Sequence, residues 1–136
     1  MSNLYKLLKI KFIKNTKGNI FKLIQNTNNK NKFDEFYISE LNPYKTKAWK
    51  YHENKVQRIY IPVGKVKIGI YQPKTKQIKI IKLGEKENKI LIIYNKVFYG
   101  FKSITKNKSL IVNLTYISNI NKEKPRNQPS IEDLIK

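Results

Sequence analysis

Apolar and polar residues alternate along most of this chain with the period of two that a β-strand produces. Residues 65–71 are the clearest case, because Val66, Ile68 and Ile70 share one face and a lysine and a glycine lie between them. The same alternation predicts strands in other parts of the chain. These are residues 5–13, 19–25, 35–41, 56–63, 77–82, 89–95, 98–104 and 109–118.

Short turn signals separate the predicted strands. Residues 17–19 and 72–76 are typical of hairpin loops. Short strands at this spacing predict an antiparallel sandwich or barrel rather than a parallel sheet covered by helices. The one helix signal is residues 130–133, where a serine can cap and two acids fill the first turn. We therefore expect an all-β barrel domain over residues 1–120 and a polar tail with a short helix over residues 121–136.

Length and composition fit one soluble domain. A chain of 136 residues, 40% of them hydrophobic, can bury one core. It has no cysteine, which excludes disulfides and thiolate metal sites and fits a reducing compartment. No apolar run approaches the roughly 18–20 residues of a membrane span, and lysines interrupt the apolar residues at the N-terminus. We expect a cytoplasmic protein without a membrane span.

The formal net charge of +20 has three possible meanings. Lysine outnumbers arginine 27 to 2, and the lysines are spread evenly at strand spacing, which favours a biased composition with solvated lysine faces. The field would also attract an anionic small molecule. A basic nucleic-acid-binding barrel is the third meaning, with Tyr60, Tyr71, Phe98 and Tyr99 stacking on bases. The scarcity of arginine disfavours nucleic acid.

The most informative stretch is residues 44–64, in which two strand-like runs flank a short polar turn. Lys50 and His52 lie two residues apart, so on a strand they share a face. The single histidine, His52, is either an acid, base or donor, or a rim residue bonded to the backbone. In a barrel interior Lys50 would be desolvated and useful as a base or anion ligand; otherwise it is one more solvated lysine. Trp49 and Tyr51 face the other way, where we expect packing.

Four further polar residues in the predicted strands are candidates for a site. Tyr99 precedes Gly100, and its hydroxyl is either an acid or donor, or a satisfied core phenol. Gln57 and Asn113 interrupt apolar strands, and each would orient a substrate hydroxyl or make a structural hydrogen bond. Arg58 would pair with a pyrophosphate or with a carboxylate at a surface or interface.

The spacing of His52, Gln57 and Gly64 resembles the first signature of the cupin barrels, which has two histidines, an acid and a glycine. Four strings also resemble small members of the dTDP-4-dehydrorhamnose 3,5-epimerase family, which are sugar-nucleotide cupins. The resemblance implies a double-stranded β-helix (cupin, or jelly-roll) barrel, a homodimer and sugar-nucleotide chemistry in cell-surface polysaccharide assembly. The strings are KAWKYH (47–52), IPVGKV (61–66), VFYGFK (97–102) and LIVNLT (110–115).

The family's chemistry, as the resemblance implies it, is proton transfer beside a ketone, with a histidine base, a lysine at the enolate oxygen and a tyrosine acid. This chain departs from that pattern at most positions. Lys50 stands at the base, Gln57 at the enolate lysine and Tyr99 at the histidine of the second signature, while the tyrosine falls near Ile117 or Ser118. One metal ligand of four remains, so we expect no metal and no cofactor.

These observations lead to one main hypothesis and two alternatives. The main one is a metal-free cupin enzyme that epimerises or isomerises a nucleotide-linked keto-sugar. The first alternative is a catalytically inactive cupin that binds a sugar or scaffolds a biosynthetic complex, and the second is the basic nucleic-acid-binding barrel. The main hypothesis assigns proton transfer to Lys50, His52 and Tyr99 and substrate binding to Gln57, Arg58 and Asn113.

Overall fold

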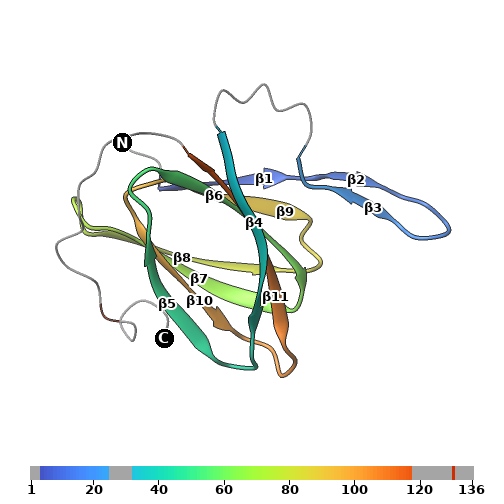
Figure 1. Ribbon diagram of the computed structural model, residues 1–136. Helices are drawn as coiled ribbons and strands as arrows, with labels where there is room; N and C mark the ends of the chain where they lie inside the picture. The colour runs from blue at the N-terminus through green and yellow to red at the C-terminus, as the bar shows by residue number, and fades with distance from the viewer. Residues whose placement is uncertain (1–3, 25–31, 118–129, 131–136) are drawn as a thin grey trace.

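The computed structural model describes residues 4–24, 32–117 and 130, which contain eleven β-strands and no helix (Figure 1). The predicted all-β class is therefore confirmed for this part of the chain. The strands are β1 (Tyr5–Lys9), β2 (Lys11–Ile13), β3 (Ile20–Lys22), β4 (Lys32–Leu41), β5 (Thr46–Tyr51), β6 (Lys55–Val63), β7 (Lys65–Gln72), β8 (Gln77–Gly84), β9 (Lys89–Ile93), β10 (Phe98–Ser103) and β11 (Ser109–Ile117).

Two antiparallel sheets form the body of the molecule. One has the strand order β1-β9-β6-β11-β4 and the other β5-β10-β7-β8. Their inner faces bury one apolar core, to which alternate residues of the central strands contribute, including Ile59 and Ile61 of β6 and Ile68 and Ile70 of β7. Non-consecutive strands are neighbours in both sheets, as in a jelly roll, and the period-two pattern is what allows one face of each strand to be apolar.

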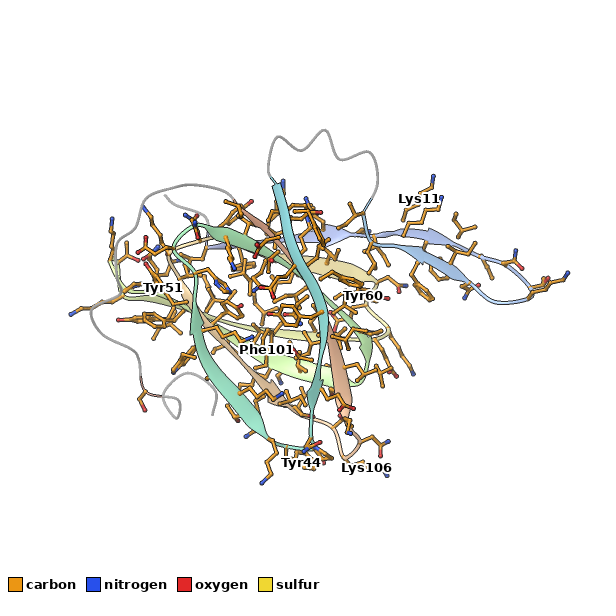
Figure 2. The ribbon with its side chains drawn as sticks, viewed as in Figure 1. Lys11, Tyr44, Tyr51, Tyr60, Phe101 and Lys106 are labelled. Atoms are coloured by element: carbon orange, nitrogen blue, oxygen red, sulfur yellow. The ribbon has the colours of Figure 1, made fainter. Side chains whose placement is uncertain are left out.

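The predicted first strand, residues 5–13, is divided in two. β1 pairs with β9 at the edge of the five-stranded sheet, whereas β2 pairs only with β3. The β2–β3 ribbon projects from the two sheets (Figure 1). Lys11, labelled in Figure 2, lies at the end of the ribbon that is close to the sheets. The predicted hairpin loops at residues 17–19 and 72–76 are confirmed between β2 and β3 and between β7 and β8.

The turn between β6 and β7 carries the chain from one sheet to the other and depends on Gly64. This glycine has φ +88°, a conformation that side chains rarely adopt. A Cβ at this position would lie 2.9 Å from the backbone Cα of Ser109, the first residue of β11. The turn therefore packs directly against the start of β11, and residue 64 has no room for a side chain.

Two predictions concern parts of the chain that the structure leaves largely undescribed. The helix over residues 130–133 receives no support, because residues 131–136 lie outside the described part, and it stays a prediction. The domain boundary at residue 120 also falls outside it and stays a prediction. No helix long and apolar enough to cross a membrane occurs in residues 4–24, 32–117 and 130.

Candidate active site

Three polar side chains from three different parts of the chain meet at one end of the barrel interior. Gln57 faces inward from β6, Tyr99 faces inward from β10, and His52 follows the end of β5. The Gln57 Nε2 donates to the Tyr99 Oη at 2.6 Å and lies 2.9 Å from the His52 Nε2. The His52 Nε2 is also 3.1 Å from the Tyr99 Oη. Each of the three groups is within hydrogen-bond distance of the other two, and the cluster joins both sheets.

Burial sets the protonation states of this cluster. Gln57 and Tyr99 are each only 1% exposed, and His52 is half-buried. Burial lowers the pKa of His52 below its ordinary value of 6.5, and the positive charges of Lys55 and Lys50 lower it further, against Glu35 and Asp34. At neutral pH His52 is therefore an uncharged imidazole.

Burial acts on Tyr99 in the opposite sense. It raises the pKa of the Tyr99 phenol far above the ordinary value of 10.0, because a phenolate would be poorly solvated there. Tyr99 thus keeps its proton and presents a hydrogen-bond donor. It is a poor source of protons for the reaction. Of the two functional roles that the sequence suggested for Tyr99, acid and hydrogen-bond donor, the raised pKa favours the donor.

A cavity of about 300 Å³ lies beside the cluster. Its walls come from β4 and β5, which are edge strands of the two different sheets, and from their neighbours β11 and β10. Tyr99 belongs both to the cluster and to the cavity wall. The lining residues are Ser39, Thr46, Lys47, Ala48, Trp49, Lys50, Tyr99, Phe101, Ile111 and Asn113. Phe101 marks this inner region in Figure 2, and Tyr44 marks the turn that joins β4 to β5.

Lys50 lines this cavity, but it is exposed and not desolvated. Its Nζ is 3.3 Å from the Tyr37 Oη on β4 and 5.2 Å from the centre of that ring. The expectation that Lys50 lines the interior is therefore met, whereas the expected desolvation of its ammonium is not found. Lys50 reaches across the cavity from β5 to β4, which suits an anion ligand better than a base.

Asn113 and Arg58, both predicted to bind substrate, are placed very differently. Asn113 is buried in the cavity wall, and its Nδ2 donates to the Ile111 carbonyl at 3.0 Å. Arg58 is next to inward-facing Gln57 on β6, so it lies on the other face of the sheet, with its guanidinium 5.6 Å from the Tyr116 ring. The structure does not bring Arg58 to the cavity.

Trp49 is in the cavity wall, although the sequence placed it on the opposite face from Lys50. The pairing of β5 with β10 passes from Lys50↔Tyr99 to Lys47↔Phe101, so two residues of β5 are left opposite Gly100. This bulge breaks the alternation on which the sequence argument depended. The Trp49 Nε1 is buried and has no hydrogen-bond partner among the described residues. Period-two reasoning missed Trp49 and Lys47 for this reason.

The sequence offered base stacking on four strand aromatics as an alternative, and the burial of these rings argues against it. Tyr60, Phe98 and Tyr99 are buried, and Tyr71 is only half-exposed. Buried rings cannot form the platform that single-stranded nucleic acid needs. Among the described residues, no group of three His, Asp or Glu side chains is arranged to hold a metal ion.

Comparison with known proteins places the fold among the nucleotide-sugar cupins. No protein-family model and no curated protein sequence matches the chain. Among solved structures, a dTDP sugar isomerase from Desulfovibrio desulfuricans matches with a TM-score of 0.77 and 26% identity, over 96% of this chain and 87% of that one. The predicted resemblance is confirmed: the chain has the fold of the dTDP-4-dehydrorhamnose 3,5-epimerase-like cupins.

Two further solved structures show the range of activities that share this fold. The dTDP-4-dehydrorhamnose 3,5-epimerase of Bacillus anthracis matches with a TM-score of 0.74 and 12% identity, over 88% of this chain and 77% of that one. The 3,4-ketoisomerase QdtA of Thermoanaerobacterium thermosaccharolyticum, as a mutant in complex with TDP-4-keto-6-deoxyglucose, matches with a TM-score of 0.70 and 22% identity, over 90% and 86%.

Proposed function

We propose that the protein is an enzyme that moves a proton beside the ketone of a nucleotide-linked keto-sugar, as an epimerase or ketoisomerase. The observation that carries this proposal is the mutual contact of His52, Gln57 and Tyr99 beside a cavity between the two sheets. The likeness to a dTDP sugar isomerase over nearly the whole chain supports the same class of substrate.

The chemistry divides between His52 and Tyr99. An uncharged imidazole can take a proton from the carbon beside a ketone, and its lowered pKa keeps it in that form at neutral pH. The Tyr99 hydroxyl retains its proton and can donate a hydrogen bond where negative charge grows on the ketone oxygen. This pairing of a base and a donor is what enolisation needs.

The number of candidate bases favours ketoisomerisation over epimerisation. His52 is the only histidine in the chain, and Lys50, which was predicted to be a base or an anion ligand, is exposed. A single base returns the proton from the side on which it took it. That suits movement of a ketone between neighbouring carbons better than inversion at one carbon, which needs a proton donor on the opposite face. We therefore favour ketoisomerisation within the proposed class.

The cavity size indicates how the substrate would lie. A volume of about 300 Å³ is at the lower end of the range for small-molecule sites. It would hold the sugar ring, with the nucleotide lying outside. Lys47 and Lys50 in the cavity wall are exposed, and the whole chain carries a charge of +20, so the diphosphate would be attracted to this opening.

The proposal includes a homodimer. β4 is the outer strand of its sheet, and three of its large apolar side chains are more than half exposed: Phe33 at 59%, Phe36 at 60% and Ile38 at 58%. An open strand edge with an apolar face is suited to a second copy of the same chain. Sedimentation should show a dimer that Phe36→Asp dissociates and Ile80→Asp, a matched change on β8, does not. A monomeric wild type would refute this part.

Solvent-exchange kinetics test the activity directly. The protein is incubated in deuterated water with dTDP-4-keto-6-deoxyglucose and other nucleotide keto-sugars, and the label is located by NMR. We expect deuterium at carbon 4 of the 3-keto isomer, because carbon 3 loses its hydrogen when it becomes the ketone. Label at carbons 3 and 5 with inversion would indicate an epimerase. His52→Gln should reduce the rate by about 10²- to 10⁴-fold. Absence of label with every substrate would refute the proposal.

A sugar-binding cupin without catalysis is the alternative, and one observation favours it. Gln57, an uncharged amide, occupies the position where the resemblance places a lysine at the enolate oxygen. A nucleotide sugar that raises the melting temperature without exchange or turnover would support this alternative. A cytoplasmic location and a role in cell-surface polysaccharide biosynthesis are part of the main proposal and rest on the same likeness.

A further inference from the structure

The amide of Gln57 is as deeply buried as Tyr99 and contacts both titratable members of the polar cluster. It faces inward from the middle of the five-stranded sheet, and its Nε2 contacts the Tyr99 Oη at 2.6 Å and the His52 Nε2 at 2.9 Å. The Gln57 Oε1 is also buried and has no hydrogen-bond partner among the described residues. The amide therefore faces the cluster with one end only.

The number of hydrogens on the amide decides whether its nitrogen or its oxygen faces the cluster. An amide nitrogen carries two hydrogens, and the cluster offers two acceptors for them, the Tyr99 Oη and the His52 Nε2. The reverse orientation would bury both hydrogens without acceptors, whereas the observed one leaves only a carbonyl oxygen unpaired. Under-satisfied carbonyls are tolerated better than orphaned N–H groups, so the orientation with nitrogen toward the cluster is favoured.

A donor aimed at the His52 Nε2 fixes the proton of the imidazole. A neutral histidine carries one proton on its two ring nitrogens, and the nitrogen that accepts a hydrogen bond cannot be the one that carries it. We propose that Gln57 is a positioning residue that holds His52 as a neutral imidazole with its proton on Nδ1, leaving Nε2 as the basic atom.

The same contact makes the charged form of His52 unfavourable. In an imidazolium both ring nitrogens carry hydrogens, so an N–H at Nε2 would meet the N–H of the Gln57 amide. A proton taken up by His52 is then readily returned to the substrate. This last step rests on the proposed function, whereas the placement of the proton on the ring does not.

Charged and titratable groups from several strands also act on His52, and the test must separate them from Gln57. Lys50 on β5 and Lys55 on β6 disfavour the imidazolium, and Asp34 and Glu35 on β4 favour it. Tyr99 on β10 is uncharged and contributes through its hydroxyl. Substitutions of Gln57 leave all of these groups in place.

Nitrogen NMR of the imidazole tests the proposal without any substrate. Because His52 is the only histidine, ¹⁵N-histidine labelling gives two ring signals that both come from this residue. The wild type should show a protonated Nδ1 and an unprotonated Nε2 above its pKa. In Gln57→Glu the new carboxylate should stabilise the imidazolium and raise its pKa by more than one unit. Gln77→Glu, the same change at an exposed position of β8, should leave the pKa unchanged.

Each outcome of this experiment decides the proposal. A wild-type ring protonated on Nε2, or a Gln57→Glu pKa equal to that of the wild type, would overturn it. Gln57→Met, which keeps the size of the side chain and removes its donor, should let the proton distribute between both ring nitrogens. A proton that stays on Nδ1 in this variant would also overturn the proposal. The NMR measurements need no turnover. The positioning role of Gln57 can therefore be refuted while the proposed activity stands, and the proposed activity can be refuted while the positioning role stands.

Discussion

The two ends of the barrel interior are built on the same strands and differ in almost every other respect. On β6, Ile59 and Ile61 face the apolar core, whereas Gln57, two residues earlier on the same face, faces His52 and Tyr99. On β11 the two ends meet, because Ile111 belongs to the core and also lines the cavity, next to Asn113. The apolar end supplies stability through burial, and the polar end must satisfy its hydrogen bonds within a small cluster. One set of strands can therefore stabilise the fold and position the chemistry.

Truncation at the apolar end should give the largest effect on stability and the smallest on activity. Ile59→Ala removes a fully buried side chain and leaves a cavity, which should cost about 2–5 kcal/mol in the free energy of unfolding by urea. Per folded molecule, solvent exchange at the substrate should stay within a few-fold of the wild type. If Ile59→Ala abolished exchange at full occupancy of the folded state, the two ends would not be separable.

Removal of the Tyr99 hydroxyl should give the opposite result. Tyr99→Phe keeps the ring in place and deletes the donor to the growing oxyanion, so the exchange rate should fall by about 10²-fold or more. The free energy of unfolding should change by only about 1–3 kcal/mol, because one buried hydrogen-bond partner is lost. Parallel kinetics and urea titration check this. A loss of stability as large as that of Ile59→Ala, with unchanged kinetics, would make Tyr99 a core residue only.

The part of the pH dependence of stability that His52 causes should report the polar end. The pKa of His52 is lower in the folded protein than its ordinary value of 6.5, so between these two values the unfolded chain binds more protons than the folded one. Stability should therefore be greatest above pH 6.5 and decline as the pH falls below it, until the folded pKa is passed. The difference in urea stability between wild type and His52→Gln, measured from pH 4.5 to 8, should contain this slope. A flat difference would contradict the lowered pKa.

Loss of the ion pair beside the polar end should have the smallest effect. The Lys55 Nζ is 2.7 Å from the Asp34 Oδ2, and both side chains are partly exposed. Lys55→Met should lower the melting temperature by only about 2–4 °C at low salt, and less at high salt. The pKa of His52 should rise, because Lys55 is one of the charges that lower it. An unchanged imidazole titration would show that this charge does not reach the cluster.

The sequence predicted most of the strands because apolar and polar residues alternate along them with a period of two. It also marked Gln57 and Asn113 as candidates for a site, since polar residues at apolar positions of a strand stand out, and both are buried. It failed where that period fails. The bulge in β5 places Trp49 in the cavity wall, and no local pattern marks it, because the irregularity lies in the pairing with β10.

The placement of Lys50 shows a second limit of sequence reasoning. Its position was expected on the inner side of β5, and its side chain does line the cavity. However, the side chain is long enough for its ammonium to reach Tyr37 on β4. Alternation along a strand gives the direction of a Cβ, and it does not say where the end of a four-carbon chain lies.

The turn at Gly64 links the dimensions of the polar end to a position outside it. Any carbon added at residue 64 would press on the backbone of Ser109, and β11 would have to shift along or away from β6. Asn113 and Thr115 lie further along that strand, Thr115 directly beside Gln57 in the register. A methyl group at the turn would thus displace the start of β11, so this glycine acts as a spacer between the β6–β7 turn and the strand that carries Asn113 of the cavity wall.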